Sequence, residues 1–355
     1  MVNLYPKGNS FRLAPFVIFA ISGFSLMSCG GSGSSITLPN TYSLNVISST
    51  MSPGQDYGYA GSDADGTVYY GSSSTEQNVT WKNGTYSPFD VSDAPLGGGL
   101  LVKGISGSAL ITKYDASENR TRSFLKRNGT WTEVPFVASA VPTSTTHDVY
   151  AQDLNSSGLV LGAMGSYPQY YFVWNSTTNE TTLLDGALFP SLNEDGTVTG
   201  IVRSDPNNFS SGRAFVQVGN QRTFLTTPTG VDIVIKNAHG TVLAYGGDHA
   251  YLFANGSTTA KEIPLSTSLS NGFVGGPLLL DGNSRVYGEI SNGNGGHSLV
   301  AYTDTGWTLL TPHLPADYPF GDVIPDETNQ AGDVVFLGHY AADPTMKSYF
   351  TLLAK

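Results

Sequence analysis

Short runs of β-branched and aromatic residues alternate with turn residues along the chain after residue 40. Seven times, a turn rich in Asn, Asp and Gly leads into a short Val-rich segment. These segments begin at Gly66, Gly107, Gly158, Gly196, Gly240, Ser284 and Gly332. Short apolar segments bounded by Gly and Asn predict β-strands, and no stretch has the periodicity of a long helix. The chain is therefore predicted to be all-β.

Each of these strands opens a longer unit that recurs about every 44 residues. After the opening strand come a variable stretch, a strand in which a polar residue and Ala precede an aromatic residue, a second turn and a Thr- and Leu-rich strand. Four short strands at this spacing are typical of one blade of a β-propeller. We therefore predict a seven-bladed β-propeller with four-stranded antiparallel blades over residues 41–355.

The two ends of the chain complement each other. The seventh unit stops after its third strand, near residues 348–353, so it lacks an outer strand. Residues 42–48 alternate like a strand but belong to no unit. Because an unpaired edge is a liability for a sheet, we expect this N-terminal strand to close the last blade.

The first 28 residues have the features of a secretion signal. Lys7 and Arg12 precede a mostly apolar stretch over residues 13–26. The stretch is short for a membrane span of about 20 residues, and an ordinary secretion signal would have a small residue in place of Leu26. Leu26-Met27-Ser28-Cys29 resembles the lipobox of bacterial lipoproteins. The resemblance implies that residues 1–28 are removed and that Cys29 is lipidated.

A flexible tether then joins the lipidated cysteine to the repeats. Residues 29–40 begin with Cys29 and continue with Gly30-Gly-Ser-Gly-Ser-Ser35, a composition that behaves as a flexible coil. Acyl chains on Cys29 would make the membrane a partner and place the protein in the bacterial cell envelope. In a Gram-negative organism, Gly30 in place of Asp after the cysteine predicts an outer-membrane lipoprotein.

The third strand of each unit carries a second resemblance. His249-Ala250-Tyr251-Leu252-Phe253, and more loosely Arg213-Ala214-Phe215, resemble the strand that gives the extracellular HAF-repeat family its name. The similarity covers nearly all of the chain after residue 40. It implies an exported propeller-like protein, and it carries no substrate or active-site residue across.

Composition restricts the chemistry. The formal net charge of −11 argues against nucleic acid as a partner, because nucleic acid binds to basic surfaces. Cys29 is the only cysteine, so no intramolecular disulfide can form. The six histidines show no metal-ligand spacing, and no nucleotide or dinucleotide fingerprint occurs. We expect a monomer without metal or cofactor.

One position in the third strand is polar in every unit. Aligning the units places these residues there: Gln77, Arg122, Tyr170, Arg213, His249, His297 and Lys347. Such residues could form a ring around one opening, suited to an anionic ligand. Alternatively, each could bond a turn of its own or a neighbouring blade, as repeated polar residues commonly do.

The connections of variable length all lie on one face of a propeller, and function commonly depends on such loops. Tyr167, Tyr318 and Phe320 lie in these stretches and could stack on sugar rings or anchor a protein partner. Alternatively, they cap the ends of blades. The candidate ligand-binding residues are Tyr167, Tyr170, Arg213, His249, His297, Tyr318 and Phe320.

These observations favour an envelope-anchored, non-catalytic module that binds glycan or protein. No catalytic residue can be named from a motif. The alternative is a propeller-fold polysaccharide hydrolase or lyase, which would need acidic and basic side chains from different blades to converge near the central opening. A third possibility is a structural envelope protein.

Overall fold

The structure is a computed structural model. It describes residues 36–354 except 47–56, 64–66, 73–77, 84, 139–145, 166–169, 204–210, 229, 267–268, 270–272, 292–296 and 329–332. By internal contacts the chain divides into residues 1–35 and a compact unit from Ile36 to Lys355. The predicted signal peptide and Cys29 lie outside the described residues. Within them, no helix is long and apolar enough to span a bilayer.

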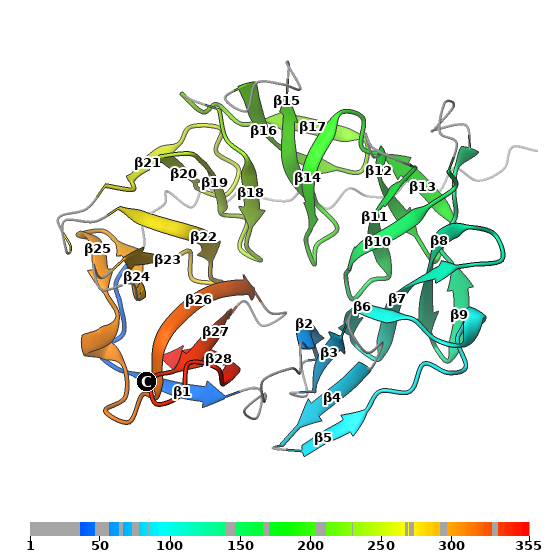
Figure 1. Cartoon of the computed structure of the whole chain (residues 1–355). Helices are drawn as coiled ribbons and strands as arrows, with labels where there is room; N and C mark the ends of the chain where they lie inside the picture. Colours follow the sequence, from blue (N-terminus) through cyan, green and yellow to red (C-terminus); the bar gives the residue numbers. More distant parts are fainter. Residues whose placement is uncertain are drawn as a thin grey trace, which may run out of the picture. The chain divides into compact units, whose positions relative to one another are not determined.

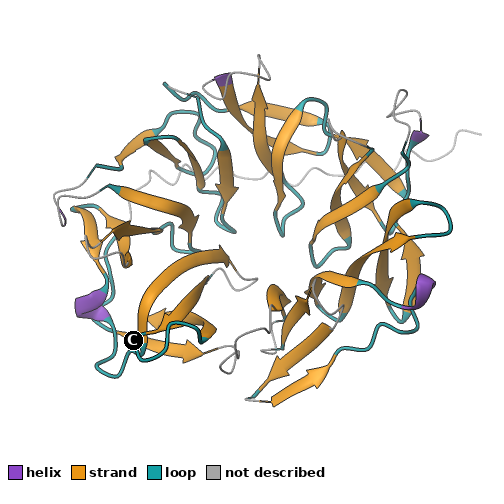
Figure 2. Ribbon diagram, in the orientation of Figure 1, coloured by secondary structure: helices purple, strands orange, loops and turns teal. Residues whose placement is uncertain are grey.

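The compact unit is a seven-bladed β-propeller, as predicted (Figures 1 and 2). Six blades are built from four strands that follow one another in the chain. Blades one to three contain β2 (Tyr57–Ser62), β3 (Val68–Ser72), β4 (Asn78–Lys82) and β5 (Thr85–Pro88); β6 (Leu100–Ile105), β7 (Ser108–Asp115), β8 (Arg120–Arg127) and β9 (Thr130–Glu133); and β10 (Val149–Leu154), β11 (Leu159–Met164), β12 (Tyr170–Asn175) and β13 (Glu180–Leu183).

The remaining blades repeat the same order. Blades four to six contain β14 (Ala187–Leu192), β15 (Val198–Arg203), β16 (Gly212–Val218) and β17 (Gln221–Phe224); β18 (Ile233–Lys236), β19 (Val242–Gly246), β20 (His249–Phe253) and β21 (Lys261–Pro264); and β22 (Val274–Leu280), β23 (Val286–Ser291), β24 (His297–Thr303) and β25 (Gly306–Leu309). Blade seven contains β26 (Phe320–Thr328), β27 (Val334–Tyr340), β28 (Lys347–Ala354) and β1 (Tyr42–Val46).

The N-terminal strand closes the ring, as the ends of the sequence predict. β1 pairs antiparallel with β28, from Tyr42 opposite Ala354 to Val46 opposite Phe350. Blade seven is thus assembled from both ends of the propeller, and β28 has no open edge.

The hydrophobic core lies in the wedges between neighbouring sheets. Phe124, Phe172, Phe215 and Tyr251, the predicted filler of the third strands, are each at most 1% exposed. One buried cluster, for example, joins Ile201 of blade four to Tyr251 of blade five. Since both faces of each sheet are covered, the inner strands are rich in Val, Leu and Ile.

Candidate functional site

The propeller has two unlike faces. Successive strands of a blade are antiparallel, so the turns after the first and third strands lie at the same end. We call this end the turn face. The opposite end, which carries the longer connections between second and third strands and between blades, is the variable face. The first strands of the blades lie innermost, around the common centre (Figure 1).

A cavity of about 530 Å³ lies among the first strands, where they end at the turn face. All seven blades contribute to its lining, and six of the lining side chains carry a carboxylate or an ammonium group. The charged lining residues are Lys103, Asp153, Glu194, Asp195, Lys236 and Asp326. Tyr59 and the amides of Asn193 and Asn237 also line it.

Irregularities in three of the first strands lie beside charged residues of the cavity. In β6 the register shifts between Leu101 and Lys103, and in β10 between Ala151 and Asp153. In β26 the register shifts between Pro325 and Glu327, which leaves Asp326 as the extra residue. A β-bulge bends its strand and re-aims nearby side chains, and bulges are frequent beside functional sites. Here each bulge lies at or next to a charged residue of the cavity.

Two lysines balance part of the negative charge. The Nζ atom of Lys103 lies 3.8 Å from Oδ1 of Asp153, and the two side chains are 18% and 26% exposed. Lys236 forms an ion pair with Asp195 and donates a hydrogen bond of 3.0 Å to Oγ1 of Thr197. The lysine–carboxylate pairs join blade two to blade three and blade four to blade five.

The carboxylates of the cavity differ in their ionisation. Burial raises the pKa of Asp153, and Lys103 offsets this only in part. The surrounding protein likewise raises the pKa of Asp326, with Lys103 again acting in the opposite direction. Burial also opposes the ionisation of Asp195, but bonds from Lys236 and Thr197 outweigh it and lower its pKa. Lys103 therefore acts on two carboxylates whose pKa is raised: it forms an ion pair with Asp153, and its charge lowers the pKa of the exposed Asp326.

Asparagines of the turns join the blades around this cavity. Asn155 donates a 3.2 Å hydrogen bond to the carbonyl of Asn193, the equivalent residue of the next blade. Asn237 likewise donates a 2.9 Å bond to the carbonyl of Asp281, while its Oδ1 accepts from the backbone N–H of Thr241. The repeated Asn thus shapes its own turn and bonds the neighbouring blade, which holds the rim of the cavity in place.

The predicted ligand-binding residues that the structure describes lie on the variable face. Tyr170 is 37% exposed at the start of β12. The guanidinium of Arg213 lies 4.5 Å from the ring centre of Phe224 in the same blade. His249 lies between Asp248, at 3.1 Å, and Glu262, at 3.4 Å. Arg213 and His249 thus contact side chains of their own blades.

His297 occupies a more enclosed position. It lies 3.5 Å from Glu289, whose side chain is 12% exposed. Burial raises the pKa of Glu289, His297 lowers it, and Asp322 of the next blade raises it again. The three groups form a small ionisable cluster between blades six and seven.

One of the aromatic residues predicted for the variable loops, Phe320, needs correction, whereas Tyr318 lies in a loop as predicted. Phe320 is not in a loop: it is the first residue of β26 and is 6% exposed. Tyr318 packs edge-on against it at 5.4 Å between ring centres, and burial raises the pKa of the Tyr318 hydroxyl. Both rings cap the end of blade seven, because they pack on Phe350. Tyr167 and Gln77 lie outside the described residues.

The predicted seven-membered ring does not hold in register. In blade three, Phe172 follows Tyr170 by two residues and pairs with Gly162 of the second strand. In the blades of Arg122, Arg213 and His249, the aromatic residue two positions later pairs with the equivalent position of the second strand. In blade six Val300 lies opposite Gly288, and in blade seven Ser348 lies opposite Gly338. His297 and Lys347 are therefore each one residue out of step, so they point to the other side of their sheets.

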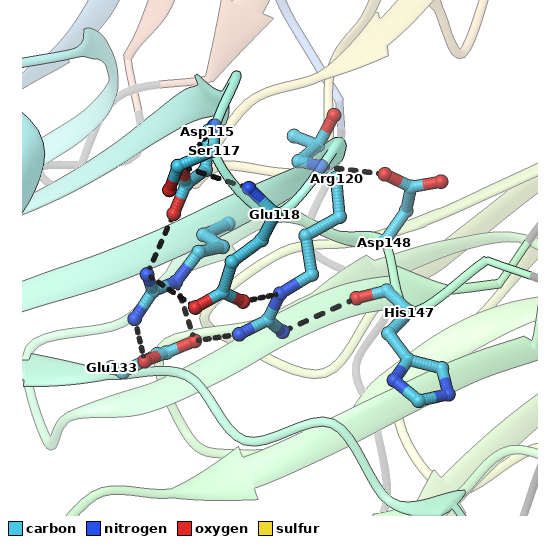
Figure 3. A network of polar contacts seen from close by, with 9 residues as sticks. Asp115, Ser117, Glu118, Arg120, Glu133, His147 and Asp148 are labelled. Atoms are coloured by element: carbon cyan, nitrogen blue, oxygen red, sulfur yellow. Dashed lines mark hydrogen bonds and ion pairs between the residues drawn. The ribbon is translucent and has the colours of Figure 1, made fainter.

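Arg122 is bound within a network on the variable face. Figure 3 labels Asp115, Arg120, Glu133 and Asp148 of this network. Its guanidinium forms ion pairs with Asp115 at 2.9 Å and with Glu133. Glu133 and the other carboxylate groups around Arg122 raise its pKa against the effect of burial. Arg120 and Asp148 extend the network to blade three, where Asp148 accepts from the backbone N–H of Thr121 at 2.5 Å. The network therefore fastens two blades together.

Sequence reasoning missed most of the cavity residues. Lys103, Asp153 and Lys236 are charged residues within otherwise apolar first strands, one to four residues before the Asn- or Gly-containing turn. That position was the available signal, because a charge in a strand covered on both faces needs a reason. No group of three or more His, Cys, Asp or Glu residues suited to a metal occurs among the described residues.

Comparisons with known proteins establish the fold of the chain but no family. No family model matches the chain, and no curated protein matches it. The β-propeller domain of the Trilobed protease from Pyrococcus furiosus, which has an open velcro topology, has a TM-score of 0.51 at 11% identity, covering 90% of this chain and 95% of that one. YCF48 from Cyanidioschyzon merolae also has a TM-score of 0.51 at 11% identity, with 88% and 99% covered.

An acylaminoacyl peptidase is similar over part of its length. Its TM-score is 0.52 at 11% identity, and the match covers 83% of this chain and 51% of the peptidase chain. These similarities define a β-propeller protein. At such low identity they establish the fold alone.

Proposed function

We propose that the protein is an envelope-anchored, non-catalytic binding module, and that its ligand contacts the charged cavity of the turn face. The observation that carries the proposal is the convergence of six charged side chains, from five blades, on one cavity lined by all seven blades. A concave site with a few convergent polar groups is the usual form of a ligand pocket.

A glycan suits this lining better than an apolar ligand. Carboxylates accept hydrogen bonds from sugar hydroxyls, while lysine and asparagine side chains donate to them. Tyr59 adds an aromatic ring at the rim. A polar protein segment would use the same groups and is the second ligand class that the proposal allows.

The test uses residues 36–355 with a panel of envelope and environmental polysaccharides, scored for co-sedimentation and for released product. We expect retention without product, and at least about a tenfold weaker retention for Lys103→Met, because two carboxylates lose their cation. Asp343→Asn, in an exposed loop of the variable face, is the matched control and should bind like the unaltered protein. Equal loss in both variants, or no loss in Lys103→Met, would contradict the cavity as the site.

A polysaccharide hydrolase or lyase is the second candidate, and one observation favours it. Asp153 and Asp326 come from different blades, lie in one cavity, share Lys103 and both have a raised pKa. A carboxyl group with a raised pKa can serve as a general acid. Product release that Asp153→Asn or Asp326→Asn abolishes, with retention unchanged, would establish this function in place of binding alone.

The membrane anchor is proposed on the sequence around Cys29 and on the HAF-repeat resemblance, which implies export. Cys29→Ser should leave an unlipidated precursor that no longer partitions with membranes. Membrane partitioning equal to that of the unaltered protein would disprove the anchor and leave the cavity proposal intact.

A further inference from the structure

The charges around the cavity of the turn face do not balance. Its described lining has two ammonium groups, those of Lys103 and Lys236, and four carboxylates. The carboxylates belong to Asp153, Glu194, Asp195 and Asp326. When all of them are ionised, two positive charges meet four negative ones and the lining has a net charge of −2. A cationic ligand is therefore attracted to the cavity, and an anionic one is repelled.

Two of these carboxylates have a lysine partner, as described above, and two do not. Glu194, in the turn after β14, accepts from the backbone N–H of Ser156 at 3.0 Å and from its hydroxyl at 2.7 Å. Among the described residues, neither Glu194 nor Asp326 forms an ion pair. Both residues are exposed, so a cation from outside the chain can reach them.

Several hydrogen-bond donors of the lining are used within the chain. Tyr59 donates from its hydroxyl to Oγ of Ser62 at 3.0 Å. Nδ2 of Asn237, which has two N–H groups, donates to the carbonyl of Asp281 at 2.9 Å and to Oγ of Ser284 at 3.1 Å. A carboxylate, by contrast, has about four acceptor positions. The lining therefore has acceptors in excess, and its ligand must supply donors.

Asp153 and Glu194 lie close together in the lining. The backbone of Leu192, two residues before Glu194, forms a hydrogen bond with the carboxylate of Asp153. Burial raises the pKa of Asp153, Lys103 lowers it, and the charge of Glu194 raises it again. An ammonium group between the two carboxylates would relieve their repulsion. Lys103 helps to keep Asp153 ionised, so the loss of Lys103 would weaken this attraction rather than strengthen it.

We propose that the cavity binds a glycan through an amino sugar whose free ammonium group binds between Asp153 and Glu194. The inference rests on the proposed function of the cavity as a glycan site, and it adds the class of sugar. A sugar ring combines an ammonium group with several hydroxyl donors on one rigid frame. A lysine side chain of a protein has one ammonium group on a flexible stem, and ordering that stem costs entropy. An amino sugar therefore fits the acceptor-rich lining better than a basic protein segment.

The test compares two oligosaccharides that differ only in this group. A hexamer of glucosamine has free amines, and the hexamer of N-acetylglucosamine has neutral amides in their place. Calorimetric titration of the full chain in detergent measures both dissociation constants at about pH 6, where amines carry a proton. We expect the glucosamine hexamer to bind at least about tenfold more tightly, because charge-assisted hydrogen bonds are roughly twice as strong as neutral ones.

Two matched variants locate the effect. Glu194→Gln removes one charge and keeps an oxygen that can accept from Ser156. The dissociation constant of the glucosamine hexamer should rise about fivefold, and that of the acetylated hexamer should change by less than about twofold. Glu180→Gln is the control, because Glu180 is also exposed and accepts a 3.0 Å bond from the hydroxyl of Thr178 but does not line the cavity. It should leave both dissociation constants unchanged.

The outcomes separate this inference from the proposed function. Equal binding of the two sugar hexamers, tighter binding of the acetylated one, or binding of neither would overturn the amino sugar. The proposed function would fall only if the polysaccharide panel also gave no retention. Equal weakening by Glu194→Gln and Glu180→Gln would overturn the cavity as the place of binding. If a hexamer of lysine binds more tightly than the glucosamine hexamer, and Glu194→Gln weakens it, the ligand is a basic protein segment instead.

Discussion

The turn face and the variable face are built from the same repeat, yet their polar side chains are used differently. On the turn face, asparagines and ion pairs bond from one blade to the next and surround a central cavity. On the variable face, Arg213 and His249 contact residues of their own blades, and the ion-pair network of Arg122 and Asp148 fastens blade two to blade three. A repeat therefore does not distribute chemistry evenly. The stereotyped turns, rather than the irregular loops, organise the candidate site.

The two faces also differ in charge balance. On the variable face, Arg120 and Arg122 meet Asp115, Glu118 and Glu133, and every one of these carboxylates has an arginine partner. In the cavity, the charge of Lys103 lowers the pKa of both Asp153 and Asp326, while Lys236 pairs with Asp195. A balanced network holds a structure together, whereas an unbalanced one leaves room for a ligand to complete it.

The largest expected effect concerns the buried ion pair beside the turn face. Arg285 forms a 2.8 Å ion pair with Asp281, and both residues are at most 9% exposed. Arg285→Ala leaves Asp281 buried without its cation, which should lower the free energy of unfolding by about 3 kcal/mol. Tm should fall on the order of 5–10 °C in calorimetry. The matched change on the variable face is Arg203→Ala, whose partner Asp232 is 36% exposed and can be solvated by water. If Arg203→Ala lowered the free energy of unfolding as much as Arg285→Ala, the expected difference in stability between the two faces would be contradicted.

A smaller loss is expected from Asn237→Ala. The change removes the hydrogen bond to blade six and leaves the buried N–H of Thr241 without its acceptor, so the free energy of unfolding should fall by about 1–3 kcal/mol. Denaturant unfolding measures this. Asn128→Gly is the control, because Asn128 has a φ of 52° in an exposed turn that glycine adopts freely. An unchanged free energy of unfolding for Asn237→Ala would show that the turn asparagines do not join the blades.

The variable-face carboxylate Asp115 should stabilise the protein at neutral pH. Hydrogen bonds from Ser117 and Arg122 lower its pKa from 3.8 to about 2. Its contribution is therefore present above pH 3.8 and lost as pH falls toward 2. Asp115→Asn should lower Tm at pH 7 by less than Asn237→Ala does. It should have little effect on Tm at pH 2. A pH-independent effect would mean that the carboxylate charge is not responsible.

The cavity carboxylate Asp153 should behave with the opposite sign, and its effect should be the smallest. Because its pKa is raised, its contribution is present below the unfolded value of 3.8 and lost as pH rises through the folded pKa. Asp153→Asn should therefore raise the free energy of unfolding more at pH 7 than at pH 3. Melting curves at the two pH values give this difference. An equal benefit at the two pH values would show that Lys103 compensates the carboxylate fully, and a larger benefit at pH 3 would show that the pKa is lowered instead.

Local features of the sequence predict the blades and the closure of the ring. Turn residues at Gly158 or Asn237 and Val-rich strands act over a few residues, and their recurrence predicted both the seven blades and the pairing of residues 42–46 with the last strand. Burial of Phe172 and Phe215 followed from the same pattern, since aromatic residues in strands covered on both faces fill the space between sheets.

Tertiary structure alone decided which side chains meet. Lys103, Asp153 and Asp326 lie far apart in the sequence, and they converge because bulges of the first strands turn them toward one centre. A shift of one residue in strand pairing took His297 out of the predicted ring, and sequence periodicity cannot reveal such a shift. The sequence by itself determined the strands and their order, because those depend on local contacts. The cavity and its charge balance depend on long-range contacts, which exist only in the closed propeller.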